Sequence, residues 1–383
     1  MKHSYIAKRF QSSGAGLSLD TEALAKYKDI IDLSIGDTDF TTDESIINAA
    51  FRDAKAGHTH YGDPKGDPEL IDAVCRAWEE DFGQRLPRDH VLVSASSCLG
   101  MALVMLAILD PGDEVIVFSP YFPMYREQIE LAGGVCVDVP TYANEDYAID
   151  EARLRAAITP RTKAIVFNNP TNPTGMGYDG KTLELLARVA QEHDLLIAAD
   201  EIYTTYLYEG DFRPIRTLPG MAERTITLNS FSKNFLMTGW RVGVIIAEPE
   251  LLAVINRING SLIYSAPSVS QRAAIQALAM RKEIREKYVT AYRDRIFYSA
   301  DRIEKLPYLS LVRPKGTFYL FPGVEKTGLD EKAFCKVLLD QAHVLVSPGT
   351  PFGVSAAGHF RIACTVGIDQ LKTAFDRMEK LSF

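Results

Sequence analysis

Seven short apolar segments recur through the middle of the chain, and each one stops at polar residues. Most of them are separated by stretches in which an apolar residue returns every three or four positions. Strand-sized runs that alternate with amphipathic helices predict an α/β domain, with a mainly parallel seven-stranded sheet covered on both faces. The expected strands are 91–95, 114–118, 135–139, 164–168, 195–200, 225–228 and 243–247, and the expected helices are 99–109, 124–132, 151–157 and 183–192.

The chain before this alternation begins with a polar stretch. Residues 1–16 contain Gly and Ser and no apolar periodicity, so we expect a mobile arm, followed by a helix at 20–27 and a strand at 30–35. Asp43 is placed to cap a helix that runs to Lys55. Asp67 is placed to cap a second helix, with Pro68 at its first position and Gly83 at its end.

The pattern changes again after residue 249. Long helical periodicities cover 251–261 and 267–306, and short apolar runs then alternate with helices, which predicts a smaller α+β domain. We therefore expect an arm with part of the small domain at 1–45, a large domain at 46–274 and a C-terminal small domain at 275–383. In the last of these, the expected strands are 311–313, 317–321, 344–346 and 360–363, and the expected helices are 331–341 and 368–381.

Composition narrows the classes of function. The 383 residues are 46% apolar and 24% charged, the balance of a soluble globular protein. A net charge of −8 without a dense Lys/Arg run argues against nucleic acid or an anionic membrane as a partner. The chain opens without a signal-peptide pattern, and its longest apolar run, 101–109, is too short to span a bilayer. Five cysteines without a Cys-x-x-Cys pair favour free thiols in a reducing cytoplasm over disulfides or a metal site.

The most informative polar stretch lies between the strands expected at 225–228 and 243–247. It contains Ser230, Ser232, Lys233 and Arg241. Polar loops at strand ends are where α/β proteins place their chemistry. A lysine between small hydroxyl residues is a candidate Schiff-base former, and the serines and the arginine would bind an anion beside it. Read in isolation, the lysine could equally be a solvated surface residue.

Three other strand ends carry polar residues that point the same way. Ser96, Ser97 and Cys98 precede a helix, where free backbone N–H groups would bind a phosphate, although simple capping by serine explains them as well. Asn172 lies in Asn-Pro-Thr-Asn-Pro-Thr-Gly, which is a stiff turn that could also present an amide to a ligand. Asp200 ends a very apolar run, where a carboxylate is costly unless it meets a cation or a donor.

Together these motifs carry a family resemblance. Asn-Pro-Thr-Gly, Asp-x-x-Tyr, Ser-x-Ser-Lys and Gly-x-Arg-x-Gly follow one another in an order and spacing that resemble the class I/II aminotransferases, of the aspartate and aromatic aminotransferase type. The resemblance runs from Gly36 to Arg361 and so covers nearly the whole chain. It implies the fold-type-I architecture, pyridoxal 5′-phosphate bound by the large domain, and a role in amino-acid metabolism.

The resemblance also implies roles for individual residues. Lys233 would form the Schiff base with the cofactor aldehyde and move the proton at the substrate Cα. Asp200 would pair with the pyridine nitrogen and keep it protonated, so that the ring withdraws electrons. Tyr203 and Asn172 would hydrogen-bond the phenolic oxygen of the cofactor, and Phe122 would stack on its ring.

The remaining implied roles concern the phosphate and the substrate. The phosphate would lie among Ser96, Ser97, Cys98, Ser230, Ser232 and Arg241. Relatives often have glycine or a lysine/glutamine where this chain has Cys98, which leaves that contact open. Tyr61 would reach the phosphate of the neighbouring subunit, which implies a homodimer with shared active sites. Arg361 would bind the substrate α-carboxylate with both arms, and the backbone of Gly36 would contact the same group.

The amino-acid side chain is the least determined part of the substrate. The resemblance suggests a pocket lined by apolar or aromatic residues: Leu17, Ile35, Tyr121, Tyr319 and Tyr264 of the partner subunit. No distal arginine for a second carboxylate stands out. We expect transfer between an aspartate, aromatic or neutral amino acid and a 2-oxo acid, with glutamate and 2-oxoglutarate as one pair.

Three other functions match parts of this pattern. A carbon–sulfur β-lyase would use the same Lys233, Asp200 and Arg361, and only the aminotransferase-like stretch at 34–40 argues against it. A cofactor-binding regulator would need a basic DNA-binding extension, which the sequence lacks. Ser230-Phe231-Ser232-Lys233 also imitates a penicillin-recognising serine enzyme, but its companion motif at Tyr142 precedes it, which is the wrong order.

Overall fold

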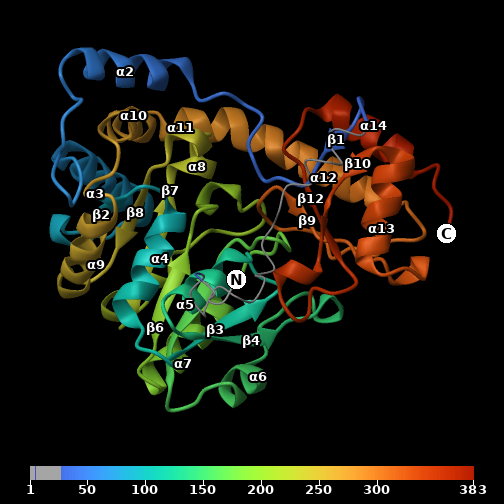
Figure 1. Cartoon of the computed structure of the whole chain (residues 1–383), viewed down its shortest axis with the longest axis horizontal. Helices are drawn as coiled ribbons and strands as arrows, with labels where there is room; N and C mark the ends of the chain where they lie inside the picture. The colour runs from blue at the N-terminus through green and yellow to red at the C-terminus, as the bar shows by residue number, and fades with distance from the viewer. Residues whose placement is uncertain (1–4, 6–26) are drawn as a thin grey trace.

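The computed structural model describes Tyr5 and residues 27–383. The arm expected at 1–16 and the helix expected at 20–27 lie outside the described residues, apart from Tyr5 and Tyr27. Figure 1 shows the large sheet with its helices on the left and two small sheets with the C-terminal helices on the right. The chain enters this right-hand part at strand β1 (Ile31–Asp32), crosses to the left at helix α2 (Glu44–Lys55), and returns through α12 (Thr290–Ile303).

The large sheet has seven strands in the order β2-β8-β7-β6-β5-β3-β4. Only β8 runs antiparallel to its neighbours β2 and β7. All seven predicted strands are present and form this single sheet, so the predicted α/β architecture is confirmed. Their bounds are β2 Val91–Ser94, β3 Glu114–Ser119, β4 Val135–Pro140, β5 Thr162–Asn168, β6 Leu196–Asp200, β7 Thr225–Ser230 and β8 Gly243–Ile246.

Helices cover both faces of this sheet. Along β3, Val115 and Val117 pack into one apolar cluster, whereas Ile116 and Phe118 pack into another on the opposite face. This alternation is the two-residue period of a strand that is buried on both sides. The first face is covered by α4 (Ser97–Ile108), α5 (Met124–Leu131) and α9 (Pro249–Leu262), and the second by α6 (Glu151–Ala156) and α7 (Gly180–Glu192).

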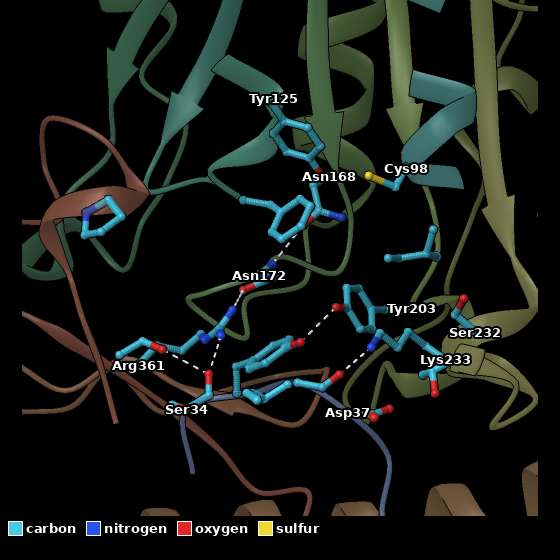
Figure 2. Close-up of a pocket in the computed structure, with 18 of the residues that line it drawn as sticks. Ser34, Asp37, Cys98, Tyr125, Asn168, Asn172, Tyr203, Ser232, Lys233 and Arg361 are labelled. Atoms are coloured by element: carbon cyan, nitrogen blue, oxygen red, sulfur yellow. Dashed lines mark hydrogen bonds between the residues drawn. The ribbon is translucent and has the colours of Figure 1, made fainter. Parts of the chain in front are cut away.

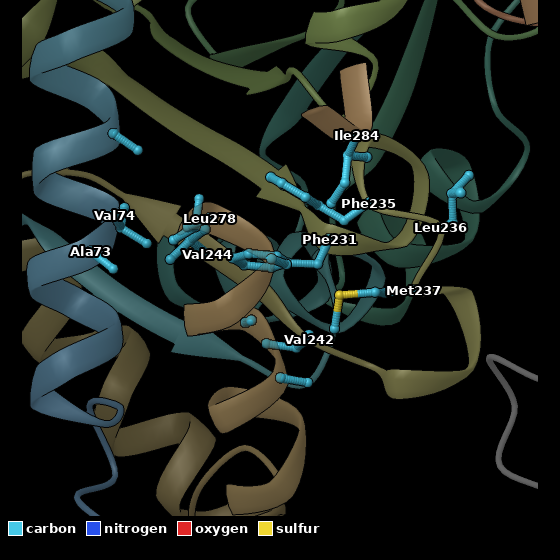
Figure 3. Close-up of a cluster of buried hydrophobic side chains, with 14 of the residues drawn as sticks. Ala73, Val74, Phe231, Phe235, Leu236, Met237, Val242, Val244, Leu278 and Ile284 are labelled. Carbon is cyan, nitrogen blue, oxygen red and sulfur yellow. The ribbon is translucent and has the colours of Figure 1, made fainter. Parts of the chain in front are cut away.

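A third apolar cluster supports the short helix α8 (Phe231–Asn234), which follows β7. Phe231 and Phe235 stack at 5.0 Å and pack among side chains of α3 (Pro68–Phe82), β8 and α10 (Ser268–Ala279), as Figure 3 shows. Helices α2 and α3 are capped by Asp43 and Asp67 as predicted, and α3 ends at Gly83 in the left-handed conformation. Lys233 therefore stands on a short helix that is anchored in the core by Phe231 and by Phe235, which follows it.

The right-hand part combines two small sheets with α12, α13 (Glu331–Val337) and α14 (Ile368–Met378). Strand β1 pairs in parallel with β10 (Val344–Leu345), and β12 (Phe360–Ala363) lies between β11 (Ser347–Pro348) and β9 (Tyr319–Leu320). One apolar cluster joins Ile31 and Leu33 to side chains of these C-terminal elements. None of the described helices is long and apolar enough to cross a membrane.

Two predictions for the C-terminal half were wrong in detail. The strand expected at 311–313 is absent, because Ser310 and Gly323 make one isolated bridge and Pro314 then has no N–H to continue a ladder. The helix expected at 267–306 is interrupted. Met280 leaves the helical conformation between α10 and α11 (Arg281–Ile284), and a π-helical segment, Arg285–Val289, precedes α12.

Gly243 is the point where the sheet contacts the loop before α4. A Cβ at this position would lie 2.7 Å from the backbone nitrogen of Ser97 and 2.9 Å from the carbonyl oxygen of Asn229. Because neither backbone atom can rotate away, we expect Gly243→Ala to destabilise the protein by about 1–3 kcal/mol, measured by urea unfolding. Gly260→Ala in α9 is the control, since nothing lies within 4 Å of the added Cβ. Equal unfolding midpoints for the two variants would contradict the prediction.

Candidate active site

One cavity of about 1020 Å³ opens at the carboxyl ends of the parallel strands, where it faces the small sheets. Its walls come from segments that are far apart in the sequence, including the ends of β5, β6 and β7 and strand β12. Of the residues predicted to act in catalysis or to bind the cofactor or the substrate carboxylate, all except Tyr61 line it. These residues are Gly36, Ser96, Ser97, Cys98, Phe122, Asn172, Asp200, Tyr203, Ser230, Ser232, Lys233, Arg241 and Arg361.

Lys233 lies in the middle of this cavity. Its Nζ donates a hydrogen bond to the backbone oxygen of Gly36, which brings the N-terminal segment against α8 (Figure 2). Burial, opposed by the charge of Asp37 and assisted by the charges of Arg361 and Arg241, lowers the pKa of its ammonium to about 8. A lysine with this pKa is partly neutral near physiological pH, so it can act as a nucleophile and as a base.

Asp200 ends β6 and is buried, with 7% of its surface exposed. Burial raises the pKa of its carboxyl to about 6, against the hydrogen bond that Tyr125 donates to Oδ2. Among the described residues its Oδ1 has no hydrogen-bond partner. A buried carboxylate oxygen without a donor is costly, so this atom is suited to a ligand that brings an N–H group.

The cavity has a second polar region around the N-terminus of α4. Ser96 caps this helix with a positive φ of 91°, and its Oγ accepts from the backbone N–H of Leu99 at 3.3 Å. Arg241 also has a positive φ, of 51°, and donates to the carbonyl oxygen of Thr238. Left-handed backbone at non-glycine residues tends to occur at functional sites. With Ser230 and Ser232 these residues form a region that suits a phosphate.

Arg361 is the buried cation on the opposite side of the cavity, with 4% of its surface exposed. One arm donates to Oδ1 of Asn172 at 3.0 Å and the other to the backbone oxygen of Ser34 at 2.6 Å, as the dashed lines in Figure 2 show. Its guanidinium lies 4.7 Å and 4.9 Å from the ring centres of Tyr319 and Phe352. Burial lowers its pKa from the ordinary value. A guanidinium held this rigidly is suited to a carboxylate.

Aromatic side chains occupy the space between these polar groups. The hydroxyl of Tyr203 lies 3.1 Å from that of Tyr319, and both residues are buried. Phe122 lines the wall near Asp200 and packs edge-on against Tyr125 at 5.7 Å.

The structure places several expected residues elsewhere. Tyr61 is 87% exposed and packs against the ring of Tyr264 at 5.1 Å, so within one chain it does not reach the cavity. Of the expected side-chain pocket, Ile35 and Tyr319 line the cavity. Tyr121 does not line it, because its ring is buried and its hydroxyl accepts from Arg126 at 3.0 Å. Leu17 lies outside the described residues.

Other residues of the site were not expected from the sequence. Tyr125 donates to Asp200, and Asn168 holds the turn by accepting from the N–H of Asn172 at 2.8 Å and donating to the carbonyl oxygen of Asp200 at 2.9 Å. Asp37 also lines the cavity near Lys233. For Tyr125 the available signal was its position in the first turn of the helix after a strand end.

The residues present suit pyridoxal 5′-phosphate. The free Oδ1 of Asp200 would accept from the protonated ring nitrogen, and Phe122 would cover the ring. Lys233 would meet the aldehyde, and the region of Ser96, Ser230 and Arg241 would hold the phosphate. The donors and acceptors of the cavity thus match the polar groups of the cofactor in kind.

Comparisons with known proteins agree with this geometry. Residues 28–378 match the family described as aminotransferase class I and II. The chain is 35% identical to arginine–pyruvate transaminase AruH of Pseudomonas aeruginosa, covering 99% of this chain and 97% of the relative. It is 38% identical to the aspartate/prephenate aminotransferase of Thermus thermophilus, covering 98% of each. The structure of the Thermus thermophilus aspartate aminotransferase with maleate superposes with a TM-score of 0.92 at 35% identity, covering 99% of this chain and 100% of that one.

The family match covers nearly the whole chain, and the relatives share its full length and its fold. The chain therefore belongs to the class I and II aminotransferases, pyridoxal-phosphate-dependent enzymes of fold type I that transfer an amino group from an amino acid to a 2-oxo acid.

Proposed function

We propose that this aminotransferase takes its amino group from an aspartate, aromatic or neutral L-amino acid and passes it to a 2-oxo acid, with 2-oxoglutarate as one acceptor. The observation that carries the proposal is one cavity in which Lys233 lies between Asp200, whose Oδ1 is free, and the buried Arg361. The reaction would run in two half-reactions, because one cofactor accepts and then returns the amino group.

The residue roles follow from the geometry. Bound pyridoxal phosphate supplies an electron-withdrawing ring next to the substrate Cα. Asp200 would hold a proton on the ring nitrogen, since a buried carboxylate favours a cationic partner. Arg361 would orient the α-carboxylate. Lys233 would move the proton between the substrate Cα and the C4′ carbon of the cofactor, a task for which its lowered pKa of about 8 is suited.

Two features of the cavity bear on the substrate. Ile35, Met101 and Leu339 give the cavity apolar surface, which suits a neutral or aromatic side chain. Lys332 and Lys336 on α13 also line it, and the ammonium of Lys336 pairs with Asp340 at 2.7 Å. These cations favour a dicarboxylic acceptor such as 2-oxoglutarate. The names of the two relatives differ in both donor and acceptor, so the family alone does not decide the substrate.

The cavity lies between two parts of the chain that we propose as moving domains. Residues 1–45 and 275–383 would form the small domain and residues 46–274 the large one. Gly36, Tyr319 and Arg361 come from the former, and Lys233 and Asp200 from the latter. Closure of the small domain over the substrate would exclude water while the Cα proton is being moved.

The five unpaired cysteines fit a role in the cytoplasm.

The test of the proposed function is the visible absorption of the holoenzyme with a panel of amino acids. Addition of an amino acid that is a true donor is expected to bleach the visible absorption band of the bound cofactor and to release the matching 2-oxo acid. Added 2-oxoglutarate should then restore this band. Lys233→Ala should keep the cofactor without a covalent bond and lose transfer, whereas Lys372→Ala on α14 is the control. Release of ammonia and pyruvate from cysteine or cystathionine would instead indicate a β-lyase. Wild-type turnover by Lys233→Ala would exclude the proposed role of that residue.

Arg361→Ala is expected to weaken amino-acid binding. Loss of a charge-assisted pair of hydrogen bonds costs about 1.5–3 kcal/mol, so kcat/KM should fall roughly 10- to 150-fold, mainly through KM. Steady-state kinetics with the donor found above would measure it. Arg313→Ala is the matched control, because that arginine is exposed and pairs only with Asp301 and Glu304 among the described residues. An unchanged KM for Arg361→Ala would contradict the carboxylate role.

We also propose a homodimer in which Tyr61 completes the phosphate site of the partner. Tyr61, Leu262 and Tyr264 are 87%, 56% and 46% exposed, which is a large apolar surface to leave in water. If so, Tyr61→Ala and Lys233→Ala chains that are expressed together should form mixed dimers with one intact site. Activity above the sum of the two separate variants is the expected result. Mixed dimers that show no recovery would contradict a shared site.

A further inference from the structure

Tyr319 connects two groups of the site that lie on different parts of the chain. It stands on β9, where it is the register partner of Ala363 on β12, so Arg361 is its diagonal neighbour on the same face. The ring centre lies 4.7 Å from the Arg361 guanidinium, and the hydroxyl lies 3.1 Å from the hydroxyl of Tyr203 (Figure 2). Only 2% of the Tyr319 surface is exposed. One buried side chain therefore contacts both the proposed carboxylate group and Tyr203.

The hydroxyl of Tyr319 is held in a confined space. A Cβ on Gly36 would lie 1.8 Å from Tyr319 Oη, so only glycine fits at that position. The backbone oxygen of the same Gly36 accepts the hydrogen bond of Lys233. Tyr319 thus packs against the segment whose backbone oxygen accepts from the proposed base.

Proton counting gives the hydrogen bond between the two tyrosines a direction. Each hydroxyl has one hydrogen to donate. If Tyr203 gives its hydrogen to a negatively charged oxygen in the cavity, the bond to Tyr319 survives only when Tyr319 donates to Tyr203 Oη. Burial raises the pKa of both tyrosines, so that each hydroxyl keeps a proton to donate.

We propose that Tyr319 is a positioning residue that donates its hydroxyl hydrogen to Tyr203, so that Tyr203 can donate its own to the ring oxygen of the cofactor, while the Tyr319 ring supports Arg361. The proposal rests on the proposed roles of Tyr203 and Arg361. It separates two contributions of one side chain. The hydroxyl acts on the cofactor side, and the ring acts on the substrate side.

Tyr319→Phe removes the hydroxyl and keeps the ring. A hydrogen-bond donor to the ring oxygen of the cofactor stabilises the charged form of that oxygen. When Tyr203 is no longer positioned by Tyr319, this form therefore appears at a higher pH. We expect the pH midpoint of the holoenzyme visible band to rise by about half a unit to one unit. The kcat should fall about fivefold, as for the loss of one hydrogen bond, while KM for the amino acid stays within about twofold. The charged groups around the two tyrosines are the same in both proteins: Asp37, Asp200, Lys233 and Arg361.

Two further variants complete the test. Tyr308→Phe removes another buried hydroxyl, bonded to the carbonyl oxygen of Met378 at 2.6 Å and not among the residues that line the cavity, and should leave the midpoint unchanged. Tyr319→Leu also removes the ring and should raise KM. A midpoint for Tyr319→Phe equal to that of the wild type or shifted no more than in Tyr308→Phe would overturn the inference. A wild-type protein without the visible band would instead overturn the proposed function, so the two failures can be told apart.

Discussion

The arrangement of this site depends on burying several charges in one cavity without neutralising all of them. Lys233, Arg361 and Asp200 are charged groups at the edge of a large apolar core, where an unpaired charge is costly. The three groups differ in the hydrogen bonds that offset this cost. The two terminal nitrogens of Arg361 donate to Asn172 and Ser34, but its Nε has no hydrogen-bond partner among the described residues. Asp200 keeps one oxygen free, and Lys233 bonds to a backbone oxygen. Each of the three groups is thus incompletely paired where the cofactor or the substrate is proposed to bind.

The fold explains why these groups can be held so closely. Parallel strands bring the ends of β5, β6 and β7 to one edge, which places Asn168 beside Asp200, and Asp200 beside Leu228, two residues before Ser230. Apolar packing beneath α8 fixes the helix that carries Lys233. The small sheets then add Arg361 and Tyr319 from the far end of the chain. Because Arg361 and Tyr319 come from a different part of the chain than Lys233 and Asp200, a change in the relative position of the two parts would act directly on the site.

Much of this was predictable from local pattern. The seven strands appear as apolar runs because a sheet buried on both faces needs continuous apolar segments, and Asp43, Asp67 and Gly83 mark helix ends by backbone chemistry. The motifs around Asn172, Asp200, Lys233 and Arg241 are recognisable because each lies at or close to the end of a strand. The prediction of a strand at 311–313 failed because a short apolar run does not show whether a partner strand lies beside it. The break at Met280 was not predicted because the helical periodicity continues on both sides of it.

The sequence by itself determined the α/β class, the seven strands, the family and the residue types needed for amino-group transfer, since all of these depend on neighbours along the chain. Only the tertiary structure decided that Tyr125 bonds to Asp200, that Tyr319 joins Tyr203 to Arg361, that Tyr121 lies away from the cavity, and that Tyr61 is exposed rather than inside its own site. The reason is physical. Those contacts join segments more than 40 residues apart or depend on which way a ring packs, and no local pattern records either one.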